Sequence, residues 1–191
     1  MSIKSERQKK YSHLDSYLLD KYIEGCANKD SAALSNLYEA VSSPVFAFAL
    51  SLLKNQQDAE DVLHDCLINV WETAGKYKSS GKPMAWIMTI CRNLSLNLLK
   101  DRSRSADIAP EDWERCLQAA EHASSEDKLF LRACMLRLSD AERRVLVLHA
   151  VSGFKHREIA EFLDMPLPTV LSKYSRAVKK LKNIWEKETV I

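Results

Sequence analysis

Residues 158–181 read EIAEFLDMPLPTVLSKYSRAVKKL. Apolar residues recur at helical spacing on both sides of a break at Asp164, Met165 and Pro166, which predicts two helices joined by a tight turn. One side of the second helix is expected to pack inward and consists of Val170, Tyr174, Ala177, Val178, Leu181 and Trp185. The other side is basic and rich in hydroxyls, and consists of Thr169, Leu171, Ser172, Lys173, Ser175, Arg176 and Lys179.

This outward face is typical of a helix-turn-helix, whose second helix enters the major groove of DNA. Arg and Lys side chains contact phosphates or guanine edges, Ser contacts either kind of acceptor, and Leu171 suits a thymine methyl group. An ordinary amphipathic hairpin with a solvated Lys/Arg face has the same pattern. The hairpin alone therefore leaves DNA binding open.

Composition favours an all-α protein with no cofactor or metal. The chain has four Gly, five Pro and no alternating strand pattern. Its five Cys are widely spaced without a C-x-x-C pair, so neither a disulfide framework nor a zinc site is expected, and a reducing cytoplasm is the natural compartment. The longest apolar run, residues 44–53, is too short to span a bilayer, so no membrane insertion is expected.

The net charge of +2 hides two basic regions and an acidic one. Basic residues gather at 4–10, 92–104 and 173–187, and acidic residues at 107–127. We expect a basic tail over 1–13, a helical domain over 14–104, an acidic linker over 105–125 and a second helical domain over 126–191.

The expected helices follow from periodicity and capping residues. The first covers 14–27. The second is capped within Asn28, Lys29 and Asp30 and runs through Tyr38, and the third is capped by Ser43 with Pro44 in first position. Further helices are expected over 57–74, 83–100 and 126–137, and from a Ser139–Glu142 capping box to near Gly153.

Helix 57–74 has an apolar and an acidic side. The expected inward stripe is Ala59, Val62, Leu63, Cys66 and Val70. The expected outward face is Asp58, Asp61, His64, Asp65, Ile68, Asn69 and Glu72. A solvated acidic face is the simplest interpretation. His64 with its flanking aspartates is not predicted to bind metal, because no second group of ligands stands at a fixed spacing.

Residues 75–100 combine a lysine-rich loop with a polar helix face. The loop GKYKSSGK places lysines, Lys78 among them, around Tyr77, which is expected to be exposed and able to stack on an unpaired base, although a plain polar connector also fits. The following helix is expected to bury Trp86, Ile90, Leu94 and Leu98. Its other face suits DNA and consists of Thr89, Arg92, Asn93, Asn97 and Lys100.

In this order the segments resemble an extracytoplasmic-function (ECF) sigma factor, a two-domain bacterial transcription initiation factor. Three motifs carry the resemblance: DAEDVLHDCLINVW at 58–71, PMAWIMTICRNLSLNLLKDRSR at 83–104 with its W-x-x-x-I-x-R-N core, and the stretch 138–181. The resemblance implies two small helical domains, binding to core RNA polymerase and promoter DNA, and no catalysis by this chain.

The resemblance also implies roles for the three surfaces. The face of Asp58, Asp61, His64, Asp65, Ile68, Asn69 and Glu72 would bind the coiled coil of the largest polymerase subunit. The melted minus-ten strand would lie on Tyr77, Lys78, Trp86, Thr89, Arg92, Asn93, Asn97 and Lys100. The hairpin would read the minus-thirty-five duplex, the acidic linker would thread the RNA exit path, and an anti-sigma factor would cover the same faces.

Several residues depart from the usual pattern of this family. Asp164 and Pro168 stand where Gly is usual, and Leu171 stands where a basic residue is usual, which favours an apolar contact with DNA there. Lys155 replaces a Ser or Thr cap, and Asn97 replaces an Asp.

Three other functions remain open from the residues alone. The first is a stand-alone helix-turn-helix repressor with a sensing or dimerising N-terminal domain. The second is a helical enzyme that uses His64 with Asp61 and Asp65, or His149 with His156, although no nucleophile or phosphate loop accompanies them. The third is a protein-interaction adaptor that only keeps the sigma architecture.

Overall fold

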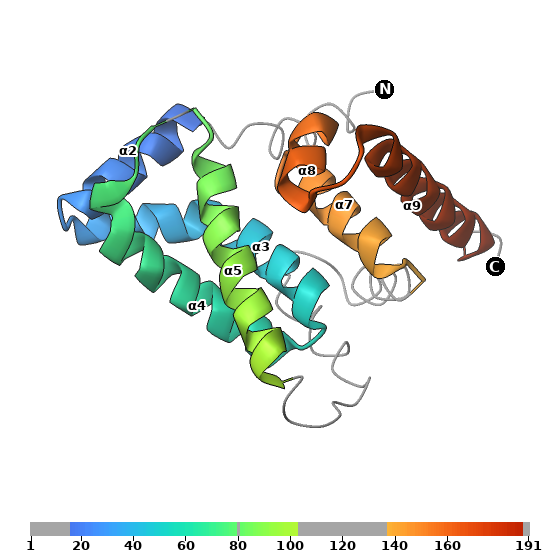
Figure 1. Ribbon diagram of the computed structural model, residues 1–191, viewed down its shortest axis with the longest axis horizontal. Coiled ribbons are helices and arrows are strands. Elements are labelled where there is room, and N and C mark those ends of the chain that lie inside the picture. Colours follow the sequence, from blue (N-terminus) through green and yellow to red (C-terminus); the bar gives the residue numbers. More distant parts are fainter. Residues whose placement is uncertain (1–15, 80, 103–136, 189–191) are drawn as a thin grey trace.

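The computed structural model describes residues 16–79, 81–102 and 137–188, and every element in these ranges is helical, as predicted (Figure 1). The elements are α2 (Ser16–Ala27), α3 (Ser31–Leu53), α4 (Gln56–Thr73), the 3-10 turn η1 (Ala74–Lys76), α5 (Pro83–Arg102), α7 (Asp140–Ala150), α8 (His156–Leu163) and α9 (Leu167–Glu188). The expected basic tail, the acidic linker and nearly all of the expected helix 126–137 lie outside the described residues.

Helices α2 to α5 form an N-terminal lobe around the long helix α3 (Figure 1). Asp30, the last of the three residues expected to cap this helix, is the cap of α3, because its Oδ1 accepts a hydrogen bond from the Ala32 N–H at 2.9 Å. Helix α3 is long and apolar enough to cross a membrane, but half of its apolar stretch is buried inside the protein. A buried core helix can have the same length and composition.

The predicted break at Ser43 is wrong, since α3 continues through Pro44. A proline inside a helix loses one backbone hydrogen bond and costs about 3 kcal/mol. Residues before and after the proline are fully buried: Val41 precedes it, and Val45 and Phe48 follow it. Each such side chain contributes roughly 1.5–3 kcal/mol when fully buried. The burial of these side chains therefore outweighs the tendency of Ser43 and Pro44 to start a new helix.

Helices α7 to α9 form a C-terminal lobe that starts with the predicted capping box. The Ser139 N–H donates to Glu142 Oε2 at 2.9 Å, and Lys180 Nζ of α9 lies 2.7 Å from the same oxygen. Burial raises the pKa of the Glu142 carboxyl, but the hydrogen bonds from Lys180 and Ser139 outweigh it and lower the pKa to about 2. This carboxylate ties the start of α7 to α9.

The turn between α8 and α9 has the predicted geometry. Asp164 adopts φ 52° and ψ 52° at the end of α8, and the Met165 N–H donates to the Ala160 carbonyl at 2.9 Å. An Asp side chain tolerates this left-handed conformation better than most residues. Lys155 supplies no side-chain cap, but Glu158 Oε2 accepts from the Lys155 N–H at 2.8 Å and satisfies one donor at the start of α8.

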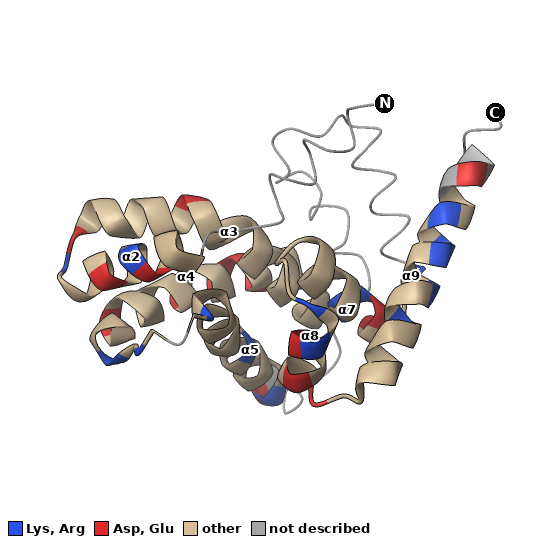
Figure 2. Cartoon of the chain, turned by 90° about the horizontal axis from the view of Figure 1, so that it is seen from above, with Lys and Arg blue, Asp and Glu red and all other residues tan. Residues whose placement is uncertain are grey.

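The two lobes pack against each other in the described structure (Figures 1 and 2). The Phe162 ring of α8 lies 5.6 Å from the Phe48 ring of α3, centre to centre. Lys54 Nζ, just after α3, lies 2.8 Å from Asp140 Oδ2 at the start of α7. Buried residues of α7 and α8 join the same apolar cluster as the core of the N-terminal lobe.

Candidate polymerase and nucleic-acid interfaces

The first candidate surface is the solvent side of α4. Asn55, which the sequence analysis did not single out, caps α4 by accepting a hydrogen bond from the Asp58 N–H at 2.9 Å. The predicted inward stripe is confirmed, with Leu67 as a further member. On the opposite side Asp61, His64, Asp65, Ile68 and Glu72 are exposed, and Asn69 is half-buried.

Asp58 does not belong to the exposed face, contrary to the prediction. Only 5% of its surface is accessible. It lies one turn before Val62 on the same side of the helix, and that side faces the core. Ile68, by contrast, is 56% exposed in the middle of the acidic face. No group of three or more His, Cys, Asp or Glu side chains among the described residues could hold a metal ion.

The second candidate surface begins with Tyr77, which is half-buried rather than exposed as predicted. Its hydroxyl donates to Asp20 Oδ1 at 2.6 Å, and its ring lies 4.7 Å from the Trp86 ring. Ser79 Oγ donates to the other oxygen of Asp20 at 2.7 Å. Asp20 lies far from the loop in the sequence, so no local pattern could have identified it. Lys78 is exposed beside this anchor.

The apolar side of α5 is rotated from the predicted stripe. Trp86, Ile90, Leu94 and Leu98 are only half-buried, and the buried residues are Pro83, Met84, Ile87, Met88, Cys91 and Ser95. Small Cys91 and Ser95 side chains allow α5 to approach α3, where Cys91 Sγ donates to the Val45 carbonyl at 3.7 Å. Burial raises the pKa of the Cys91 thiol to about 12, which keeps it protonated and unreactive.

The polar side of α5 is accessible except at its arginine. Thr89, Asn93 and Asn97 stand at four-residue intervals and are exposed, as is Lys100. Arg92 is half-buried, and its guanidinium carbon lies 5.9 Å from the centre of the Phe162 ring. Thus α8 covers one of the predicted DNA-contacting residues.

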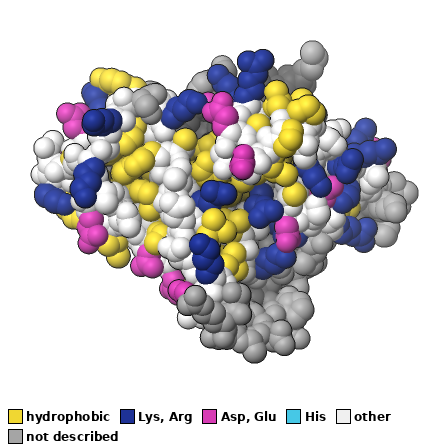
Figure 3. All heavy atoms as spheres, viewed as in Figure 1, with side chains coloured by type: hydrophobic (Ala, Val, Ile, Leu, Met, Phe, Trp, Pro, Cys, Tyr) yellow, Lys and Arg dark blue, Asp and Glu magenta, His cyan; other side chains and the backbone are white. Residues whose placement is uncertain are grey.

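The third candidate surface is the outward side of α9. Leu171, Ser175, Arg176 and Lys179 are exposed, whereas Thr169, Ser172 and Lys173 are half-buried. Figure 2 shows Lys and Arg recurring along this helix. Figure 3 shows Lys and Arg side chains spread over both lobes on one face.

The inward side of α9 differs from the prediction at two residues. Val170 and Ala177 are buried, but Val178 is 41% exposed, and Ile184 is buried instead. Val178 lies two turns after Leu171, so it belongs to the same solvent face. The side chain of Trp185, also predicted to face inward, lies outside the described residues.

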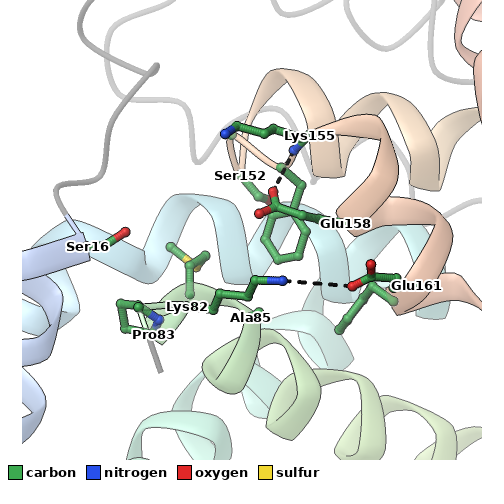
Figure 4. A pocket seen from close by; sticks show the side chains of 13 residues that line it. Ser16, Lys82, Pro83, Ala85, Ser152, Lys155, Glu158 and Glu161 are labelled. Carbon is green, nitrogen blue, oxygen red and sulfur yellow. Dashed lines mark hydrogen bonds and ion pairs between the residues drawn. The ribbon is translucent and has the colours of Figure 1, made fainter. Parts of the chain in front are cut away.

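A cavity of about 660 Å³ lies between the lobes, next to the start of α5 and to α8 (Figure 4). Lys82 and Met84 line it from the N-terminal lobe, and Phe154, Glu158 and Glu161 line it from the C-terminal lobe. Lys82 Nζ lies 3.8 Å from Glu161 Oε2 across it. Glu158 Oε2 accepts a hydrogen bond from the Lys155 N–H at 2.8 Å, so both carboxylates of the cavity are engaged.

Comparisons with known proteins match both lobes to one family. Residues 37–105 match Sigma-70 region 2, and residues 131–181 match Sigma-70, region 4. The first range contains the α4 and α5 surfaces, and the second contains α7, α8 and most of α9.

Curated relatives carry the same assignment over most of their length. The ECF RNA polymerase sigma factor SigK of Mycobacterium sp. (strain KMS) is 27% identical over 176 residues, which cover 86% of this chain and 89% of the relative. The ECF RNA polymerase sigma factor EcfG of Rhodopseudomonas palustris (strain TIE-1) is 29% identical over 137 residues, covering 71% of this chain and 75% of the relative.

Solved structures agree. The sigma factor RpoE in complex with the anti-sigma factor NepR from Bartonella quintana is similar with a TM-score of 0.57 and 25% identity, covering 74% of this chain and 89% of that one. CnrH in complex with the cytosolic domain of CnrY shares the fold, with a TM-score of 0.58 and 19% identity, covering 89% of this chain and 98% of that one. The chain therefore belongs to the sigma-70 family, as an ECF-type sigma factor that directs transcription initiation.

Proposed function

We propose that the exposed face of α4 captures core RNA polymerase. The observation that carries this proposal is Ile68, a largely exposed isoleucine ringed by the exposed carboxylates Asp61, Asp65 and Glu72. A small apolar centre within a charged rim is typical of a protein interface, where the centre supplies affinity and the rim supplies orientation. The coiled coil of the largest polymerase subunit is the proposed partner.

We propose that α5 and the preceding loop hold the melted minus-ten strand. Thr89, Asn93 and Asn97 form one polar stripe whose hydroxyl and amide groups suit base edges, and the exposed Lys78 and Lys100 suit phosphates. The Tyr77 and Trp86 rings are fixed by their mutual contact and by Asp20. A rigid aromatic pair of this kind supports stacking of a flipped base, which needs a surface that is already ordered.

Helix α9 is the proposed reader of the minus-thirty-five duplex. Arg176, Ser175 and Leu171 are exposed together on its outward side. Three other residues of the predicted set, Thr169, Ser172 and Lys173, are half-buried. They are better placed to contact the DNA backbone than to reach deep into the groove. The exposed apolar residues Leu171 and Val178 favour contacts with thymine methyl groups.

The contact between the lobes implies an opening step. Phe162 covers Arg92, so α5 cannot offer its full polar face while α8 lies on it. The exposed α4 face is accessible in the same arrangement. We therefore expect polymerase capture to be possible before the lobes separate, and full contact with the minus-ten strand only afterwards.

The proposed setting is the cytoplasm, where polymerase and promoter DNA are present. An anti-sigma factor is the proposed regulator, since the similar RpoE structure is a complex with one. Such a partner would compete for the α4 and α9 faces. No residue of this chain is assigned a catalytic role, because the chemistry belongs to the polymerase.

The deciding experiment is run-off transcription with purified core polymerase and a promoter library, with and without this chain. Sequence-specific initiation only in its presence is the expected result. A stand-alone helix-turn-helix repressor would instead bind duplex DNA without polymerase and would produce no transcripts. An adaptor would bind polymerase and still produce none.

A further inference from the structure

Two histidines of the C-terminal lobe are stacked on each other where its three helices meet. His149 lies near the end of α7 and His156 begins α8; their ring centres are 4.2 Å apart with an interplanar angle of 28°. The Tyr174 ring of α9 meets both edge-on, at 4.7 Å from His149 and 4.8 Å from His156. One aromatic cluster thus joins α7, α8 and α9.

Hydrogen bonding offers no partner to a proton on His156 Nε2. His149 Nδ1 lies 2.8 Å from the Phe154 carbonyl oxygen and donates to it, since a carbonyl oxygen can only accept. His156 Nε2 is buried and has no hydrogen-bond partner among the described residues. A proton there would place an unpaired donor in the interior, next to a second imidazole. Protonation of His156 therefore places a charge in the stack, and no hydrogen bond compensates for its burial.

The charged groups around the cluster do not offset such a charge. From α9 the group that faces the pair is Tyr174, and from α7 it is His149 itself. Among the side chains of the lobe that the structure describes, the carboxylates are engaged elsewhere or exposed: Asp140 with Lys54 and Arg143, Glu142 with Lys180, Glu158 with the Lys155 N–H, Glu161 with Lys82, Glu186 with Lys182, and Asp164 in the exposed turn. Lys155 and Arg157, which flank His156, are cations.

We propose that the His149–His156–Tyr174 cluster is an acid-sensitive joint that loosens the helix-turn-helix when the cytoplasm acidifies. Burial lowers the pKa of His156, and the neighbouring His149 lowers it further. The pKa of His156 is therefore lower in the folded chain than its unfolded value of about 6.5. The stability that neutral His156 contributes is complete above about pH 6.5, and it is lost as the pH falls towards the pKa of the folded chain.

The expected consequence for DNA rests on the proposed role of α9. If α8 no longer holds α9 in place, Arg176 and its neighbours lose their common orientation, and binding of duplex DNA weakens. The α4 surface lies in the other lobe and contains none of these groups. Loosening of the joint should therefore affect promoter contact more than polymerase capture.

Hydrogen exchange of the full chain, followed by mass spectrometry at pH 7.5 and 5.5 and corrected for intrinsic exchange, tests the joint directly. Between the pKa of His156 in the unfolded chain and its lower pKa in the folded chain, only the unfolded chain binds the proton. Over this range we expect the protection of the α7–α9 amides from exchange to fall by about tenfold for each pH unit. Protection of α2–α5 should change less. The variant His156→Phe keeps a ring in the stack but cannot be protonated, so its pH response should be reduced. Tyr38→Phe, on the other lobe and outside the proposed binding surfaces, should respond as the wild type does.

An NMR titration of the His156 ring in the wild type gives an answer even if the variant does not fold. A His156 titration at or above the ordinary histidine range would overturn the proposal. An unchanged pH response in His156→Phe would also overturn it. Binding of a duplex promoter selected in the run-off experiment, measured at both pH values, forms a separate arm. No duplex binding at either pH would refute the role of α9 in DNA reading, while the exchange result would still decide on the joint.

Discussion

The guanidinium of Arg92 on α5 lies 5.9 Å from the centre of the Phe162 ring on α8, and this contact joins the two lobes at a predicted DNA-contacting residue. Phe162 also packs on Phe48 of α3 and on Phe154 of its own lobe. It therefore holds the lobes together and shields Arg92 at the same time.

Replacing Phe162 by Ala should separate the lobes and improve access to α5. Truncation of a fully buried Phe costs about 3–5 kcal/mol, so the half-buried Phe162 should lower the free energy of unfolding by less. We expect a longer distance between fluorophores on the two lobes and tighter binding of a single-stranded minus-ten oligonucleotide. The control Phe162→Leu keeps apolar packing and should stay closer to the wild type. An unchanged distance in Phe162→Ala would refute the role of Phe162 in holding the lobes together, and unchanged oligonucleotide binding would refute its shielding role.

Replacing Ile68 by Ala should weaken binding to core polymerase. A central apolar anchor within a charged rim is typically worth 2 kcal/mol or more, which corresponds to roughly a 30-fold loss of affinity. Thermal unfolding should hardly change, because Ile68 is 56% exposed. The matched control is Tyr38→Ala, which truncates an exposed large side chain on α3, away from the α4 face. This variant should bind polymerase normally. Equal losses in both variants would argue against a specific α4 interface.

Replacing Arg176 by Ala should reduce promoter binding and relax the base preference at one position of the minus-thirty-five element. A guanine contact by Arg is worth about 1–3 kcal/mol of discrimination. Competition binding with a set of single-base duplex variants measures this. Lys182→Ala, further along α9 and also exposed, should leave the preference intact. An equal loss on every duplex would instead identify Arg176 as a phosphate contact.

Replacing Glu142 by Gln should destabilise the C-terminal lobe in a pH-dependent way. The pKa of Glu142 is lowered to about 2, so stability from its carboxylate is present above the ordinary Glu value and is lost as pH falls towards 2. A hydrogen bond to a charged group is worth about 1.5–3 kcal/mol, and the variant should lose an amount of this order at pH 7. Urea unfolding of both proteins from pH 7 to pH 2 should therefore converge at the acidic end. Glu186→Gln, in an exposed pair with Lys182, should cost about 0.5 kcal/mol or less.

Local signals in the sequence determined the elements, the family and most of the exposed surfaces. The Asp30 cap, the Ser139–Glu142 capping box, the left-handed turn at Asp164 and the inward stripe of α4 depend on residues a few positions apart, so periodicity and capping chemistry suffice to predict them. The family motifs are likewise contiguous stretches of sequence. The site roles drawn from them stay predictions.

Tertiary packing alone decided the features that join distant residues. Pro44 remains inside α3 because both flanks of that helix are buried, and Tyr77 is held by Asp20, 57 residues away in the sequence. The cover of Phe162 on Arg92 and the stacking of His149 on His156 depend on where whole helices meet. Such contacts arise from the summed burial of many side chains, which no single stretch of sequence encodes.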